Sequence, residues 1–142
     1  MTQEQKDLLL QDLCTRLPYG VKVKLGDNPN IFDLEYRIKF AIMYGDSDKL
    51  EDILDITNIK PYLFPLSSMT NELWDKEFMG CGITEFTRDS FKYGCETLEF
   101  NNDNPHLSSM VRFINQLIKN HFDIYGLIPM GLAIDATGLN IY

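Results

Sequence analysis

The chain has 142 residues, of which 44% are apolar and 24% charged, and this composition is ordinary for one globular domain. Thirteen basic residues against twenty-one acidic ones give a net charge of −8, which disfavours general binding to nucleic acids or anionic membranes. No apolar run approaches membrane-spanning length, and the first residues lack the features of a signal peptide. We therefore expect a single domain over residues 1–142, cytoplasmic and not associated with a membrane.

The first segments of the chain predict a helix followed by a strand. Thr2 and Gln5 have the spacing of a capping box, and apolar residues follow at helical spacing until Pro18 and Gly20 end the helix. The apolar positions are Leu9, Leu10, Leu13, Cys14 and Leu17. Residues 21–25 alternate between apolar and basic side chains, which predicts a half-buried strand.

Residues 34–44 also alternate, because Leu34 and every second residue after it up to Tyr44 are apolar or aromatic. This pattern predicts a second strand, paired with residues 21–25 in a hairpin. Such a hairpin would place four basic residues on one polar face: Lys22, Lys24, Arg37 and Lys39. We predict that this face is simply solvated, with nucleic-acid binding as the alternative.

The stretch over residues 59–78 contains the single Trp and two prolines. Pro61 and Pro65 favour extended backbone but suit neither a helix interior nor a central strand. Ser67, Ser68 and Thr70 are then candidate N-caps of a helix that starts near residue 70. The aromatic residues of this stretch have two interpretations, core packing or an exposed contact surface for a protein partner, the latter formed by Tyr62, Phe64 and Trp74.

The remaining segments complete an α+β interpretation. A short helix is expected around residues 50–54, and residues 83–100 are compatible with two strands but remain ambiguous. Asn104 and Pro105 predict the start of a helix that runs to residue 121 and has one apolar face. The apolar C-terminal stretch is interrupted by glycines and is expected to pack rather than extend freely. Together these elements predict a small antiparallel sheet on the 21–44 hairpin, with the 105–121 helix on its apolar face.

Three blocks of the sequence resemble a known group of proteins. Residues 16–25, 59–70 and 120–142 are similar, in order and spacing, to uncharacterised small proteins of phages, prophages and mobile elements of Bacteroides-type gut bacteria. These blocks cover roughly a third of the chain. The resemblance implies a bacterial cytoplasm and an accessory gene of phage or mobile-element origin, and it implies no activity, cofactor or catalytic residue.

The residue patterns provide little catalytic chemistry. His106 and His121 would lie about 22 Å apart on one helix, so they cannot share a metal ion, and we predict no metal or cofactor. The phosphate-binding glycine motifs are also missing from the sequence. The sequence has three cysteines, an odd number, at Cys14, Cys81 and Cys95, and it has no CxxC motif. This pattern indicates reduced thiols.

His121 is the residue on which an enzymatic interpretation would depend. Cys81 or Cys95 could be a nucleophile with His121 as its base. The simpler explanation is a partly protonated imidazole at a helix C-terminus that donates a hydrogen bond to Asp123.

Three functional hypotheses follow from the sequence. The first is a non-enzymatic accessory protein that binds a protein partner. A homo-oligomer is also compatible with the sequence. The second is a Cys/His-dependent enzyme, and the third is nucleic-acid binding through the basic hairpin face, which the net charge disfavours.

Overall fold

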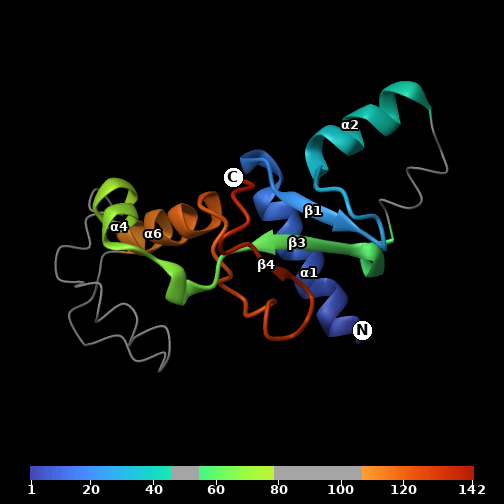
Figure 1. Ribbon diagram of the computed structural model, residues 1–142. Coiled ribbons are helices and arrows are strands. Elements are labelled where there is room, and N and C mark those ends of the chain that lie inside the picture. The colour runs from blue at the N-terminus through green and yellow to red at the C-terminus, as the bar shows by residue number, and fades with distance from the viewer. Residues whose placement is uncertain (46–54, 79–106) are drawn as a thin grey trace.

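The computed structural model describes residues 1–45, 55–78 and 107–142. Within these ranges, four α-helices and a four-stranded sheet make an α+β fold (Figure 1), which confirms the predicted fold class. The helices are α1 (Gln3–Arg16), α2 (Leu34–Tyr44), α4 (Asn71–Glu77) and α6 (Leu107–Lys119). The strands are β1 (Lys22–Leu25), β2 (Phe32–Asp33), β3 (Ile59–Leu63) and β4 (Ile134–Asp135). No described helix is long and apolar enough to cross a membrane.

The sheet is open, with the strand order β2-β1-β3-β4. β1 pairs antiparallel with β2 and with β3, whereas β4 pairs parallel with β3, so the sheet is mostly antiparallel. The strand predicted over residues 21–25 is therefore confirmed as β1. The predicted short helix near residue 50, the ambiguous residues 83–100 and the predicted cap at Asn104 lie outside the described residues.

Pro61 lies inside β3, although β3 has a neighbouring strand on each side and Pro is disfavoured in central strands. The register explains this exception to our expectation. Pro61 opposes Val23, and the bond from the Gly26 N–H to the Asn58 carbonyl makes 23–61 a pair that exchanges no hydrogen bonds with β1. On the other side, β4 pairs only with residues 62 and 63. Among the residues that the structure describes, the missing Pro61 N–H therefore removes no hydrogen bond from the sheet.

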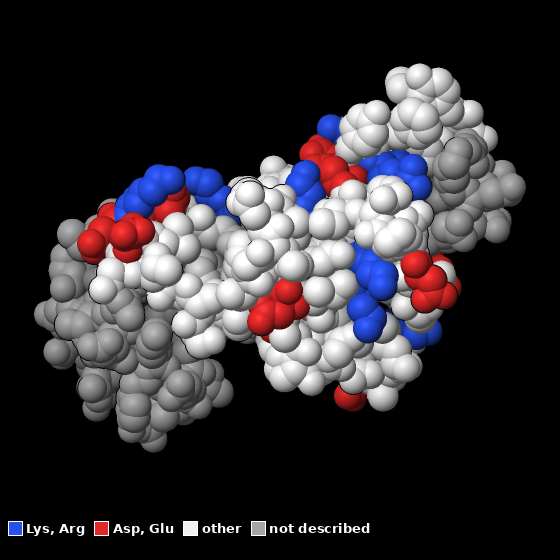
Figure 2. All heavy atoms as spheres, in the orientation of Figure 1, with Lys and Arg blue, Asp and Glu red and all other residues white. Residues whose placement is uncertain are grey.

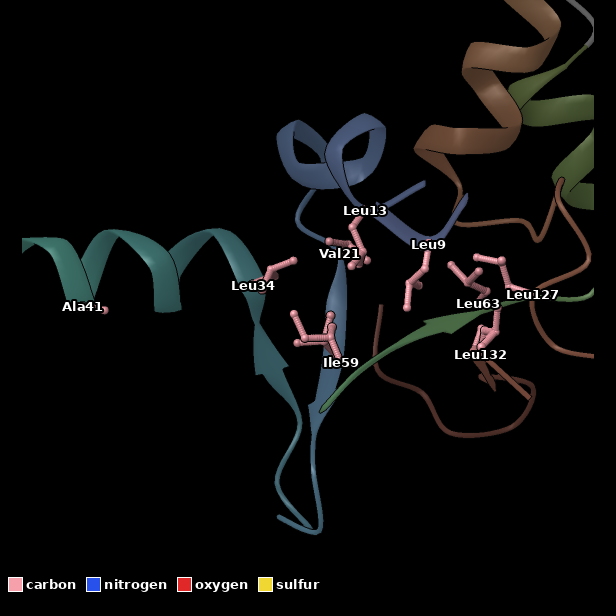
Figure 3. Close-up of a cluster of buried hydrophobic side chains, with 11 residues drawn as sticks. Leu9, Leu13, Val21, Leu34, Ala41, Ile59, Leu63, Leu127 and Leu132 are labelled. Carbon is pink, nitrogen blue, oxygen red and sulfur yellow. The ribbon is translucent and has the colours of Figure 1, made fainter. Parts of the chain in front are cut away.

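Helix α1 covers the sheet and contributes to the main hydrophobic core. The predicted capping box is present, since the Thr2 side chain accepts from the Gln5 N–H and the Gln5 side chain accepts from the Thr2 N–H. Of the predicted apolar stripe, Leu9 and Leu13 are buried, whereas Leu10 is exposed. Figure 3 shows Leu9 and Leu13 directed at side chains of the strands. The buried residues of this core are Leu9, Leu13, Val21, Val23, Leu34, Ala41, Ile59, Leu63, Leu127, Leu132 and Ala133.

A second hydrophobic cluster lies where α4 and α6 meet. The helix predicted to start near residue 70 is confirmed as α4, and the Thr70 side chain accepts a hydrogen bond from the Leu73 N–H. We expected the helix near 105–121 on the sheet, but it packs against α4, and α1 takes its place. The buried members of this cluster are Met69, Trp74, Phe78, Leu117 and Phe122. The C-terminal segment is packed, as predicted, because Leu127 and Ala136 are completely buried.

The strand predicted over residues 34–44 is wrong, because these residues form helix α2. On the side of β1 where the hairpin partner was expected, the paired residues are Phe32 and Asp33, so the pairing ends where α2 begins. A stretch that is apolar at every second position also contains apolar residues at every fourth position. The spacing of four residues is that of neighbours on a helix surface, so a helix with two apolar sides produces the same alternation as a strand.

Candidate protein-interaction surface

The aromatic residues predicted as a contact surface are largely enclosed. Tyr62 is 7% exposed and Trp74 is 8% exposed, while Phe64 is partly buried. The Trp74 ring stacks on Phe78 with 5.5 Å between centroids, and Phe64 lies against Phe122 with 6.2 Å between centroids. Their burial favours the packing interpretation over an exposed surface formed by these three residues.

The predicted basic hairpin face does not form, because two of its four members lie on a helix. Lys22 and Lys24 are on β1, whereas Arg37 and Lys39 are on α2. Lys22 forms an ion pair with Asp33 at 3.0 Å, and the Arg37 guanidinium lies 4.6 Å from the Phe32 ring centroid. Lys39 forms an ion pair with Glu35 one turn earlier on the same helix.

His121 is enclosed directly after α6, while Cys81 and Cys95 lie outside the described residues. The imidazole stacks on the Tyr142 ring with 3.8 Å between centroids, and its Nδ1 has no hydrogen-bond partner among the described residues. Burial, and then the Arg16 charge, lower the pKa of His121 to about 4 against the opposing effect of a hydrogen bond with the Tyr19 backbone. The imidazole is therefore neutral at pH 7, contrary to the partly protonated state that we expected.

Asp123 does not accept a hydrogen bond from His121 as predicted. Its two carboxylate oxygens accept from the backbone N–H groups of Leu127 and Ile128, both at 2.8 Å. Asp123 therefore stabilises the turn that follows α6. At 5% exposure, His121 is also poorly placed to reach a substrate, so its position favours a structural role.

The Tyr142 hydroxyl joins the ends of two strands. It donates to the Tyr62 carbonyl at 2.7 Å and accepts from the Lys22 N–H at 3.1 Å. Lys22 and Tyr62 would be the next hydrogen-bonded pair of the β1–β3 ladder, so the hydroxyl bridges them where the strands separate. Burial raises the pKa of Tyr142 to about 12, which keeps this hydroxyl protonated as a donor.

A completely buried ion pair attaches α1 to the end of α6. The Arg16 Nε donates to both carboxylate oxygens of Asp12, at 2.9 and 2.8 Å. Its two terminal nitrogens donate to the carbonyls of Ile118, at 3.2 Å, and Phe122, at 2.7 Å. Both side chains are 0% exposed. Burial raises the pKa of Asp12 although the Arg16 contacts act in the opposite direction. Asp12 and Arg16 are thus part of the architecture rather than an accessible site.

Helix α2 is flanked by residues that favour the two ends of a helix, an N-cap before it and a glycine after it. The Asp33 side chain accepts a hydrogen bond from the Tyr36 N–H at 2.9 Å, which is an N-cap. This bond, with a smaller contribution from Lys22, holds the pKa of Asp33 below its usual range. At the other end, Gly45 has a φ of 62° and its N–H bonds back to the carbonyls of Ala41 and Ile42. These two flanking residues are the sequence signal that identifies the helix.

The inner side of α2 packs on the rest of the protein. Leu34 and Ala41 are 3% and 2% exposed, and Ile38 is partly buried against the same core. These residues are separated by four and three positions, so they lie on one side of the helix.

The opposite side of α2 is an aromatic and apolar surface that our sequence prediction missed. We call its four residues the outer stripe: Tyr36, Phe40, Met43 and Tyr44. Their spacing of i, i+4, i+7 and i+8 places them on one helix side. Tyr36, Met43 and Tyr44 are 64%, 70% and 65% exposed. Phe40 lies between the tyrosines, with ring centroids 6.1 Å from Tyr36 and 4.5 Å from Tyr44.

The outer stripe is also distinct in its position and charge. Figure 1 shows α2 extending away from the sheet, and Figure 2 shows mainly uncharged atoms over its outer end. Ile42 is also exposed, at 67%, but it lies on a different side of α2 from the stripe. From typical aromatic side-chain areas, the stripe exposes on the order of 400 Å², a size at which patches on monomers are often functional. The outer stripe is therefore the candidate functional surface of the described chain.

Comparison with known proteins gives no further guide to the function: no protein-family model, no curated protein and no solved structure matches this chain.

Proposed function

We propose that this protein is a non-enzymatic interaction module whose outer stripe binds an uncharged, apolar helix face of a partner protein. In keeping with the sequence resemblance, we propose that it acts as an accessory protein of phage or mobile-element origin. The observation that supports the interaction role is the exposure of Tyr36, Met43 and Tyr44 on one side of α2, opposite the side that packs on the core.

The hydrophobic effect supplies the driving force for such a contact. Burial of about 400 Å² of apolar surface contributes on the order of 10 kcal/mol before the entropic costs of association are subtracted. The stripe extends over residues 36–44, which is the length of helix that apolar anchors at i, i+4 and i+7 use to dock on a partner. Rigid aromatic side chains lose little conformational freedom on binding, which further favours Tyr36 and Tyr44 as anchors.

A comparison of three tagged baits tests the proposed function. The baits are the unchanged protein, Met43→Glu on the outer stripe and Leu10→Glu on α1. Leu10 is a matched control because it is also an exposed apolar helix residue, at 53%, but lies outside the stripe. Nuclease-treated lysate and mass spectrometry then identify the bound proteins, and circular dichroism verifies that each bait is folded.

We expect the unchanged protein and Leu10→Glu to recover the same protein, either an untagged copy of this chain supplied with the lysate or another protein. Met43→Glu should lose it, because the variant places a charge in a desolvated contact. If Met43→Glu retains every partner of the unchanged protein, the proposed function of the outer stripe is wrong.

A further inference from the structure

We infer that the partner of the outer stripe is a second copy of this chain, bound through antiparallel pairing of the two α2 helices. This inference rests on the proposed function and names the partner. The three aromatic residues of the outer stripe are symmetric about Phe40, with Tyr36 four residues before it and Tyr44 four residues after it, whereas the position that mirrors Met43 is occupied by Arg37. A two-fold axis near Phe40 would therefore place each Tyr36 opposite the partner's Tyr44.

Helix geometry is compatible with this arrangement. Tyr36 and Tyr44 are separated by about 12 Å along the helix axis, and packed helices have axes about 8–10 Å apart. The aromatic rings of each stripe can therefore interdigitate with those of the other. A two-fold interface uses the same surface on both subunits and so requires a self-complementary surface, which the Tyr–Phe–Tyr spacing provides. Antiparallel helices also place opposite ends of their dipoles side by side.

The distribution of charge favours contact at α2 over contact elsewhere. The chain carries a net charge of −8, so two copies repel one another in general. α2 itself adds little to this repulsion, since Arg37 and Lys39 against Glu35 leave the helix with a net charge of only +1. Added salt screens the repulsion between the remaining acidic surfaces but does not weaken an apolar contact. Dimerisation is therefore expected to strengthen, or at least not to weaken, as salt is raised.

The size of the surface sets the expected affinity. The two stripes, at about 400 Å² each, together bury on the order of 800 Å², which lies below the range of stable specific interfaces and within that of weak, transient ones. The dimer should therefore be reversible, with a dissociation constant on the order of 10 µM.

Sedimentation equilibrium on the full chain tests this inference. The protein concentration is varied over about 1–500 µM, a range that spans the expected dissociation constant. The mean mass of the unchanged protein and of Leu10→Glu should rise from 16.4 kDa towards twice that value. Met43→Glu should require at least about tenfold more protein to reach the same mean mass, the effect of a 1.4 kcal/mol loss.

A second set of variants tests the antiparallel orientation. Tyr36→Lys and Tyr44→Glu should each weaken the dimer when introduced alone. The double variant Tyr36→Lys/Tyr44→Glu should recover dimerisation, because opposite charges then meet across the two-fold axis. A double variant weaker than both single variants would contradict the antiparallel pairing.

The outcomes also separate this inference from the proposed function. A chain that remains monomeric at every concentration, but loses another protein on Met43→Glu substitution, contradicts the dimer and leaves the interaction role intact. A dimer that Met43→Glu does not weaken also contradicts the inference, since it must use another surface. A chain that forms no dimer and binds no protein contradicts both.

Discussion

Replacement of Arg16 by Met tests whether the buried ion pair holds α1 to the end of α6. The substitution keeps a side chain of similar length but removes the charge and every hydrogen-bond donor. Asp12 is left 0% exposed without its cation, and the carbonyls of Ile118 and Phe122 lose the donors at 3.2 and 2.7 Å. Loss of one partner of a buried ion pair typically costs about 3–5 kcal/mol. This cost is a large part of the roughly 5–15 kcal/mol by which a domain is stable.

Urea unfolding, followed by the fluorescence of the single Trp74, measures this loss. We expect the midpoint of Arg16→Met to fall well below that of the unchanged protein. The double variant Asp12→Leu/Arg16→Met separates the cause, because it also removes the unpaired carboxylate. It should be more stable than Arg16→Met alone by about 1 kcal/mol or more, since replacing both partners of a polar contact costs less than removing one.

Two results would refute the reasoning about Arg16. One is a loss of less than about 1 kcal/mol in Arg16→Met, which is the range of an exposed ion pair. The other is a double variant as unstable as the sum of the two single variants, which would show that Asp12 and Arg16 are not coupled.

Three further predictions concern stability. Because the pKa of His121 is lowered to about 4 from 6.5, the unfolded chain binds more protons between these values, so stability should fall by about 3 kcal/mol as pH drops from 7 to 4. His121→Asn should lose most of this pH dependence, and Asn is chosen because it tolerates the φ of 59° at this position. Urea titrations at several pH values measure the effect. An unchanged pH profile would be evidence against burial of the imidazole. Tyr142→Phe leaves the Lys22 N–H and the Tyr62 carbonyl without their shared hydroxyl and should cost about 1–3 kcal/mol, whereas a neutral effect would show that the bridge does not contribute. Thr2→Ala removes the α1 cap and should lower thermal stability by about 1 kcal/mol, and an unchanged unfolding temperature would contradict this.

Features that depend on neighbouring residues could be predicted from the sequence. The Thr2–Gln5 capping box and the Thr70 cap each join residues three positions apart, and both are present in the structure. The alternation of residues 22–25 likewise reflects a local property of a strand with one buried side.

The error at residues 34–44 has a specific physical origin. Alternation favours a strand, although the same residues satisfy helical spacing on two opposite sides of α2. Asp33 and Gly45 favour the helix, because one caps its N-terminus and the other adopts the left-handed conformation after its C-terminus. These flanking residues predict α2, and the helical spacing of its aromatic residues then predicts the outer stripe.

The burial of individual side chains could not be predicted in the same way. Arg16 looks like an exposed basic residue in the last turn of α1, and its burial depends on carbonyls more than a hundred positions away in the sequence. Tyr62 and Trp74 could be interpreted as surface or core until the packing around them was known. Such long-range contacts have no local sequence signal.

Oxidative footprinting of methionines tests most directly whether the outer stripe is covered when the protein associates. Met43 lies on the stripe and is 70% exposed, and Met130 is a matched control outside α2 that is 47% exposed. At protein concentrations well above the dissociation constant, or with a bound partner, we predict that Met43 oxidises several-fold more slowly while the rate at Met130 does not change. Equal rates at Met43 in the free and associated states would contradict the claim that this protein acts through α2.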